Sequence, residues 1–185
     1  MIRRRRKKKG GAGGVARSMS CPECRRRFVP VRSGGGVARE QVCPFCFERV
    51  EKPDTVPSLK AETWKVFAVL VKLSHRDSAG FCMCVTCGVQ LQWDDRNMHA
   101  GHFLQSRSKG ILFEKVGVNP QCHRCNVILH GNTDEYWPWM LRTHGQAEID
   151  RLLDAKWRGG NWTLDELRAL HSDFSAQVAD ILSRS

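Results

Sequence analysis

Four Cys-x-x-Cys pairs constrain this chain more than any other feature of its sequence. They begin at Cys21, Cys43, Cys84 and Cys122 and use eight of the nine cysteines. Such a turn directs two thiolates at one ion about 2.3 Å away, so two turns complete a closed tetrahedral zinc site. No apolar segment of the signal-peptide kind is present near the N-terminus, which favours metal over disulfides. We therefore expect two structural zinc ions.

The two sets of cysteines differ in the length of chain between their pairs. The first set consists of Cys21, Cys24, Cys43 and Cys46. The short connection between its two pairs has a length typical of a zinc ribbon. The second set consists of Cys84, Cys87, Cys122 and Cys125. The connection between its two pairs is nearly twice as long, too long for a simple ribbon. A further structure must therefore fold within this second loop. Cys82 is left as a free thiol or a minor alternative ligand.

The positive charge of the chain is concentrated near its N-terminus. The formal net charge is +11, and residues 1–30 hold eleven lysines and arginines against the single acid Glu23. A glycine-rich stretch follows the basic run, which predicts a disordered arm that binds a polyanion or serves only as a solvated tail. A second basic run, in the ribbon, is a further candidate for phosphate contacts. The candidate DNA-binding residues are Arg3, Arg4, Arg5, Arg6, Lys7, Lys8 and Lys9 in the arm, and Arg25, Arg26 and Arg27 in the ribbon.

Residue types suited to metal binding and proton transfer gather inside the second cysteine loop and just after it. They are His99, His102, Asn119, Asn126 and His130. Their order is typical of a ββα-metal nuclease, in which a strand hairpin carries histidines and a following helix supplies the remaining ligands. Residues 126 and 130 are four apart, so a helix would place them on one face. A lone histidine is more often a surface or core residue, so the hypothesis depends on the cluster.

Several strings of this sequence resemble one known family. They are C-x-x-C-x-x-x-F-x-P from Cys21, L-K-x-x-x-W-K-V-F from Leu59, C-x-T-C-G from Cys84, H-A-G-H-F from His99, N-P-Q-C-x-x-C-N from Asn119 and H-G-N-x-x-E-Y from His130. Together, over about residues 20–185, they resemble the lambdoid phage NinG/Rap family of the HNH superfamily. The resemblance implies an endonuclease that cuts Holliday junctions and D-loops during phage recombination.

The resemblance also implies roles for individual residues. His102 stands at the position of the general base, Asn126 at a metal-ligand position, and Asn119 at the position of an asparagine that holds the hairpin. Gly101 replaces the usual ligand before the base, so His99 and His130 are the candidate substitutes. A catalytic Mg²⁺ or Mn²⁺ would stabilise the charge that develops on the scissile phosphate.

The remaining sequence predicts helices around this core. Apolar spacing from Pro57 predicts a helix that links the two zinc units, and Thr163-Leu-Asp-Glu166 is a capping box that starts a long C-terminal helix. That helix packs on the core or pairs with a second subunit as a homodimer. The expected divisions are a basic arm (1–19), a zinc ribbon (20–52), a linking helix (58–76), a nuclease core (80–145) and a C-terminal helical region (146–185).

The sequence thus predicts an α+β protein with a small zinc-stabilised ββα-metal core, an N-terminal zinc ribbon and flanking α-helices. We expect it to act in the cytoplasm of a bacterial host on branched or four-way DNA, without membrane contact. Two alternatives stay open. One is a non-catalytic zinc-finger protein that binds nucleic acid, which would not need His102. The other is an HNH nuclease of the restriction or homing type, which shares the chemistry but recognises a DNA sequence.

Overall fold

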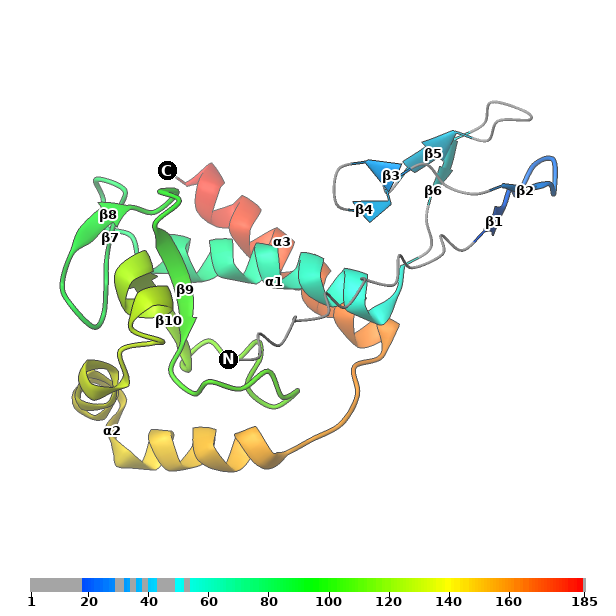
Figure 1. Cartoon of the computed structure of the whole chain (residues 1–185). Helices are drawn as coiled ribbons and strands as arrows, with labels where there is room; N and C mark the ends of the chain where they lie inside the picture. The colour runs from blue at the N-terminus through cyan, green and yellow to red at the C-terminus, as the bar shows by residue number, and fades with distance from the viewer. Residues whose placement is uncertain are drawn as a thin grey trace, which may run out of the picture. The chain divides into compact units, whose positions relative to one another are not determined.

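A computed structural model of the chain describes residues 18–28, 32–33, 36–37, 40–42, 49–51 and 54–184. The chain divides into two units, residues 1–53 and 54–185, and Figure 1 traces both by colour. Some predicted site residues lie outside the described residues. They are the basic run from Arg3 to Lys9, and the cysteines Cys43 and Cys46.

The described residues of the first unit form three short antiparallel hairpins. Their strands are β1 (Met19–Ser20) with β2 (Arg27–Phe28), β3 (Arg32–Ser33) with β4 (Gly36–Val37), and β5 (Glu40–Val42) with β6 (Arg49–Glu51). The first Cys-x-x-Cys pair occupies the turn between β1 and β2. There the Arg25 N–H donates to the Cys21 carbonyl over 2.9 Å, and Cys21 and Phe28 are buried together. The predicted knuckle is therefore a tight turn at the end of a hairpin.

The second unit is organised around α1 (Val56–Ser74). The Thr55 side chain accepts from the Ser58 N–H, and the Ser58 hydroxyl accepts from the Thr55 N–H, which forms a capping box at the predicted start. Its apolar stripe is buried, and the ring of Phe67 lies 5.0 Å from that of Phe174. Helix α1 is therefore part of the core of this unit rather than a free linker.

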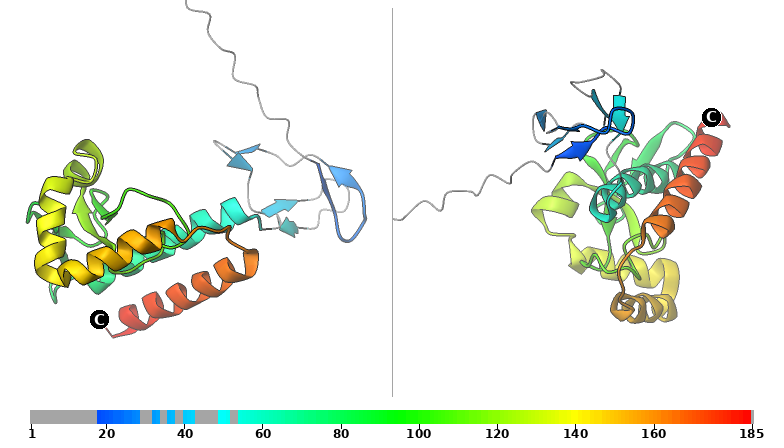
Figure 2. Two further views of the ribbon diagram at one scale, coloured as in Figure 1. Left: turned by 90° about the horizontal axis from the view of Figure 1, so that it is seen from below. Right: turned by 90° about the vertical axis from the view of Figure 1, so that its right-hand side faces the viewer.

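The C-terminal helix α3 (Leu164–Ser183) begins at the predicted capping box, where the Thr163 N–H donates to Glu166 over 2.9 Å. It lies alongside α1 in both views of the second unit (Figure 1 and Figure 2). Its apolar face contributes Phe174, Leu170 and Val178 to the cluster around Phe67. The face that could have joined a second subunit is thus used within the chain, so a homodimer would need another surface.

Two further hairpins lie in the second unit. Strands β7 (Phe81–Met83) and β8 (Gln90–Gln92) pair with each other, and β9 (Met98–His102) pairs with β10 (Val118–Cys122). Val118 of β10 is fully buried in the α1–α3 cluster, which fixes the β9–β10 hairpin on the helical layer. This hairpin carries three of the five predicted catalytic residues, His99, His102 and Asn119.

The chain after β10 departs from the regular helix that the sequence predicts. Helix η1 (Arg124–Ile128) is a single wide π turn, in which the Leu129 N–H donates to the Arg124 carbonyl over 2.8 Å. His130, with φ of 48°, lies beyond its end. The expectation that Asn126 and His130 share one face of an α-helix was therefore wrong, because the turn widens and the backbone then becomes left-handed.

Helix α2 (Thr133–Trp157) follows η1 and is interrupted at Gly145, where φ is 79° and ψ is 169°. The expected nuclease core (80–145) ends at this glycine, but the helix resumes directly after it. Side chains from the two halves meet in a second buried cluster, which contains Phe103, Tyr136, Met140, Ile149 and Leu152. The whole is a mixed α+β fold with short antiparallel sheets, as the sequence predicted. Among the described helices, none has the length and apolar character to cross a membrane.

Replacing Phe67 by alanine should lower the free energy of unfolding by about 3–5 kcal/mol, since this side chain is fully buried among other aromatic rings. Urea unfolding followed by circular dichroism measures the change. Trp157→Ala is the matched control, because Trp157 is 80% exposed, and it should change stability by less than about 1 kcal/mol. Equal losses for the two variants would contradict the assignment of the core.

Candidate functional site

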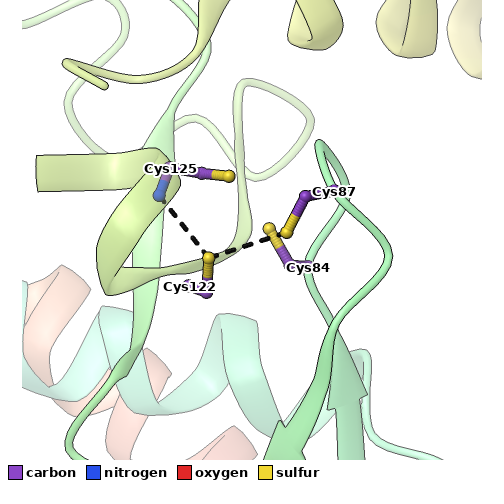
Figure 3. A group of neighbouring side chains, drawn as sticks. All are labelled: Cys84, Cys87, Cys122 and Cys125. Carbon is purple, nitrogen blue, oxygen red and sulfur yellow. Dashed lines mark hydrogen bonds between the residues drawn. The ribbon is translucent and has the colours of Figure 1, made fainter. Parts of the chain in front are cut away.

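Four cysteines from two segments converge in the second unit. Cys84 and Cys87 lie in the turn between β7 and β8, while Cys122 ends β10 and Cys125 lies in η1. Their sulfur atoms all lie within 4.8 Å of one another and point toward a common centre (Figure 3). All four thiols are free of disulfides. The predicted second set is therefore assembled although a long loop separates its pairs.

The spacing of these sulfur atoms suits a metal ion. Cys87 and Cys122 Sγ are 3.7 Å apart, close to the edge of about 3.8 Å that a tetrahedron with 2.3 Å zinc–sulfur bonds requires. The Cys125 N–H approaches Cys122 Sγ at 3.5 Å, and Asn132 Nδ2 approaches Cys125 Sγ at 3.6 Å. Donors of this kind stabilise thiolates over thiols. The four cysteines can therefore hold one zinc ion in a closed structural site.

The ninth cysteine does not belong to this cluster. Cys82 is fully buried in β7, and its thiol donates to the Lys72 carbonyl over 3.0 Å. Burial raises the pKa of the Cys82 thiol, so this group stays protonated. Of its two predicted roles, the structure gives Cys82 that of a free thiol. In the first unit, Cys21 and Cys24 are described, but the other two predicted ligands are not.

The β9–β10 hairpin holds His102 in a fixed ring orientation. The His102 imidazole stacks on the Trp64 ring with centroids 4.7 Å apart and planes 15° from parallel. His102 Nε2 lies 3.1 Å from the Leu112 carbonyl oxygen, which can only accept, so Nε2 carries the proton. His102 Nδ1 then has a free lone pair, which accepts from Arg107 over 3.3 Å. The basic nitrogen of this histidine is therefore Nδ1.

The surroundings of His102 keep its imidazole neutral. Burial lowers the pKa of His102 to about 4, and the Leu112 carbonyl and the positive charge of Arg107 act as smaller causes in opposite directions. A neutral imidazole at neutral pH can accept a proton from water. The structure thus gives His102 the protonation state that a general base requires.

His99 and Asn126 form a second polar pair beside His102. His99 Nε2 lies 3.2 Å from the Arg96 carbonyl oxygen, and His99 Nδ1 lies 3.0 Å from Asn126 Nδ2. Because the carbonyl requires a proton on Nε2, Nδ1 accepts and the Asn126 amide donates. Burial lowers the pKa of His99. This histidine therefore orients Asn126 through its only free lone pair.

An open pocket of about 360 Å³ lies between the hairpin and the end of η1. Its walls include Ala100, His102, Gln105, Ser106, Arg107, Asn126, His130 and Gly131. A second hollow of about 250 Å³ shares Arg107 and Asn126 with it and adds Lys72 and His99. Arg107 lines both hollows and Lys72 lines the second, and neither has a carboxylate among its described lining residues. The positive charge suits an anionic ligand such as a phosphodiester.

The structure separates the predicted catalytic residues into two groups. His99, His102, Asn126 and His130 lie around these two hollows. Asn119 is 2% exposed and faces the interior, where its Nδ2 donates to the Val116 carbonyl over 2.9 Å. This contact lies at the start of β10, and the role of holding the hairpin that the family resemblance implied stays a prediction.

Several residues of the site have no counterpart in the sequence prediction. Arg107 contacts His102 and lies over the Trp64 ring at 5.2 Å, and Gln105 donates to the His130 carbonyl. The basic pair in the loop after the H-A-G-H-F string was the only available signal for Arg107. Trp64 belongs to the L-K-x-x-x-W-K-V-F string, which carries no sign of its contact with His102.

Comparison with protein families identifies one match. The family model described as Bacteriophage Lambda NinG protein matches residues 48–183, which include α1, the cysteine cluster, the hairpin and α3. The chain belongs to the NinG family. The match begins after the basic arm and the first cysteine set. Comparisons with curated proteins and with solved structures gave no match.

In this NinG-family protein, Cys125→Ser should remove one equivalent of zinc per chain, because a closed site loses a thiolate that an alcohol does not replace. Elemental analysis of the purified protein measures the zinc content. The control is Cys82→Ser, which changes a buried cysteine outside the cluster and should keep the full content. Zinc loss in the control, or full zinc in the first variant, would contradict the assignment.

His102 should remain neutral well below pH 6. Its pKa of about 4 lies below the value of about 6.5 for an exposed histidine, so the unfolded chain takes up the proton first as the pH falls. Its contribution to stability is therefore complete above about pH 6.5 and is lost progressively toward pH 4. NMR titration of the histidine ring signals measures this pKa. A His102 midpoint near 6.5 would refute the burial argument.

Proposed function

We propose that this NinG-family protein is a metal-dependent endonuclease that cuts branched DNA, including four-way junctions and D-loops, in phage recombination. The observation that carries the proposal is the neutral His102, whose unprotonated Nδ1 lies beside Arg107 at a pocket with no carboxylate among its described lining residues. Phosphodiester hydrolysis needs a base for the attacking water beside a site that accepts a phosphate. Both requirements meet in this pocket.

The structure supports a division of roles between the residues of the pocket. His102 Nδ1 takes the proton of the attacking water, while the Leu112 carbonyl keeps the other ring nitrogen protonated and the Trp64 ring limits its rotation. Arg107 covers Nδ1 in the free protein and is close enough to transfer its hydrogen bond to a bound phosphate. The same side chain thus binds the substrate and uncovers the base.

The donor set of the pocket also fits a divalent cation. Asn126 offers a carboxamide oxygen, and burial lowers the pKa of both His99 and His102, so these two rings carry no positive charge at neutral pH. When bound, Mg²⁺ or Mn²⁺ would supply charge stabilisation for the scissile phosphate and the leaving oxygen. The cysteine cluster remains structural, because its four thiolates leave zinc no open position.

Membership of the NinG family and the H-A-G-H-F string support a recombination substrate over a restriction or homing role. The basic arm supports sequence-independent affinity for phosphates. A four-way junction has approximate two-fold symmetry and needs two cuts, which a homodimer would provide.

His102→Ala should lower cleavage of a labelled four-way junction by about 10²–10⁴-fold in Mg²⁺ or Mn²⁺, and leave junction binding intact, since only the proton acceptor is removed. The wild type should cut the junction in preference to a matched linear duplex and should be inactive in EDTA. His171→Ala, on α3 and away from the pocket, is the control with full activity.

Two results would contradict the proposal. If the wild type binds the junction but does not cut it in the presence of either metal, the chain is a zinc-dependent binding protein. If His102→Ala cuts as fast as the wild type, the reaction uses another base.

A further inference from the structure

The second hollow, of about 250 Å³, lies along one face of α1. Trp64, Ala68 and Lys72 line it at intervals of four residues, so their side chains follow one stripe of the helix. Strand β9, which packs against α1, contributes Ala100 to the same hollow. The two alanines each carry only a methyl group, which leaves space between the helix and the strand. The hollow therefore results from small side chains where α1 and β9 meet.

Lys72 brings a positive charge to this hollow without a matching carboxylate. Its side chain is half-buried, and its Nζ lies 5.9 Å from the centre of the Trp93 ring. Burial lowers the pKa of the Lys72 ammonium, and nearby acids, Asp94 and Asp95 among them, act in the opposite direction with smaller effects. Within the described part of the chain, neither acid lines the hollow or forms an ion pair with Lys72. An anion bound in the hollow would supply the missing partner.

Arg107 is the second cation at this hollow, and it has donors to spare. His99 uses both of its ring nitrogens within the protein, since Nε2 lies 3.2 Å from the Arg96 carbonyl oxygen and Nδ1 lies 3.0 Å from Asn126 Nδ2. Arg107 is exposed and lines both hollows. One of its N–H donors contacts His102 Nδ1 over 3.3 Å, and a guanidinium has several more. Its side chain can therefore serve an anion in each hollow.

The two hollows adjoin, because Ala100, Arg107 and Asn126 line both of them. A DNA strand carries one phosphate per nucleotide, so a strand with one phosphate beside His102 brings its next phosphate to the neighbouring hollow. Ammonium and guanidinium groups bind phosphate oxygens through charge-assisted hydrogen bonds. The lining of the second hollow thus fits a phosphodiester.

We propose that the second hollow binds the phosphodiester next to the scissile one, that Lys72 supplies the charge that holds it, and that Arg107 contacts both phosphates. The inference rests on the proposed function and adds a second phosphate subsite to it. A strand held at two successive phosphates cannot slide along the pocket. Lys72 therefore positions the scissile phosphate against His102 Nδ1.

The test measures binding of a fluorescent four-way junction by anisotropy, with the full chain loaded with zinc and a His102→Ala background that keeps the DNA intact. Lys72→Gln should weaken junction binding about three- to tenfold, and it should lower the slope of log affinity against log salt concentration by about 0.9, the value for one phosphate contact. Lys115→Gln is the matched control, because Lys115 donates to Gln177 of α3 and lines neither hollow. The control should change junction affinity by less than about twofold.

Ala68→Glu tests the hollow while Lys72 stays in place. The new carboxylate would lie one helical turn before Lys72, at the spacing that lets a glutamate and a lysine pair, so the substitution supports helix α1. It would also neutralise Lys72 and repel a phosphate, so junction binding should weaken about tenfold or more. Zinc content and thermal unfolding report whether each variant is folded.

A scan with single methylphosphonates locates the phosphate that Lys72 binds, because this group carries no charge. At one position it should weaken binding of the parent about three- to tenfold and binding of Lys72→Gln by less than about twofold. That position should lie next to the phosphate at which the wild type cuts.

Unchanged affinity and salt slope in folded Lys72→Gln, or full affinity in folded Ala68→Glu, would overturn the inference. A coupled phosphate away from the cleavage site would overturn it as well. Because the readout is binding, the two proposals can fail separately. If Lys72→Gln behaves as expected and the protein with His102 intact cuts no DNA, the phosphate subsite stands and the nuclease proposal fails. If the junction is cut but Lys72→Gln keeps its affinity and salt slope, the nuclease proposal stands and this inference fails.

Discussion

The convergence of four thiolates from two distant segments is the constraint on which the second unit depends. It ties the turn after β7 to the end of β10 and the start of η1, across the long loop from Cys87 to Cys122. The strands on either side are short, so their own hydrogen bonds would hold the loop only weakly. A zinc ion at this point would contribute folding energy directly. The β9–β10 hairpin between the pairs then lies against α1 in one register, and its two histidines line the two hollows.

Within that frame, backbone carbonyls decide the chemistry of the side chains. The Leu112 carbonyl makes His102 Nδ1 the basic nitrogen, and the Arg96 carbonyl makes His99 an acceptor for Asn126. The Gly131 carbonyl fixes the amide of Gln121 in the same manner. Each of these carbonyls belongs to a loop or turn. The loops around the hairpin are therefore as important for the site as the strands that carry the side chains.

Much of the fold could be predicted from the sequence, because its signals are local. The apolar spacing from Pro57 and the capping box at Thr163 predicted two helices, and cysteine spacing predicted the second metal-binding set. The course of the chain after Cys125 could not be predicted. A regular helix was expected there, but a wide π turn and left-handed residues at His130 and beyond replace it. Local propensity does not reveal such a turn when tertiary contacts enforce it.

The sequence by itself determined which residue types are available: thiolates at metal spacing, a histidine after a small residue, and an asparagine beside the second knuckle. Only the tertiary structure decided how they are used. It brought Arg107 to His102, directed Asn119 into the core, and packed the buried Gln121 amide against Gly101. The physical reason is that protonation states and amide orientations follow from hydrogen-bond partners, and those partners come from segments that only folding brings together.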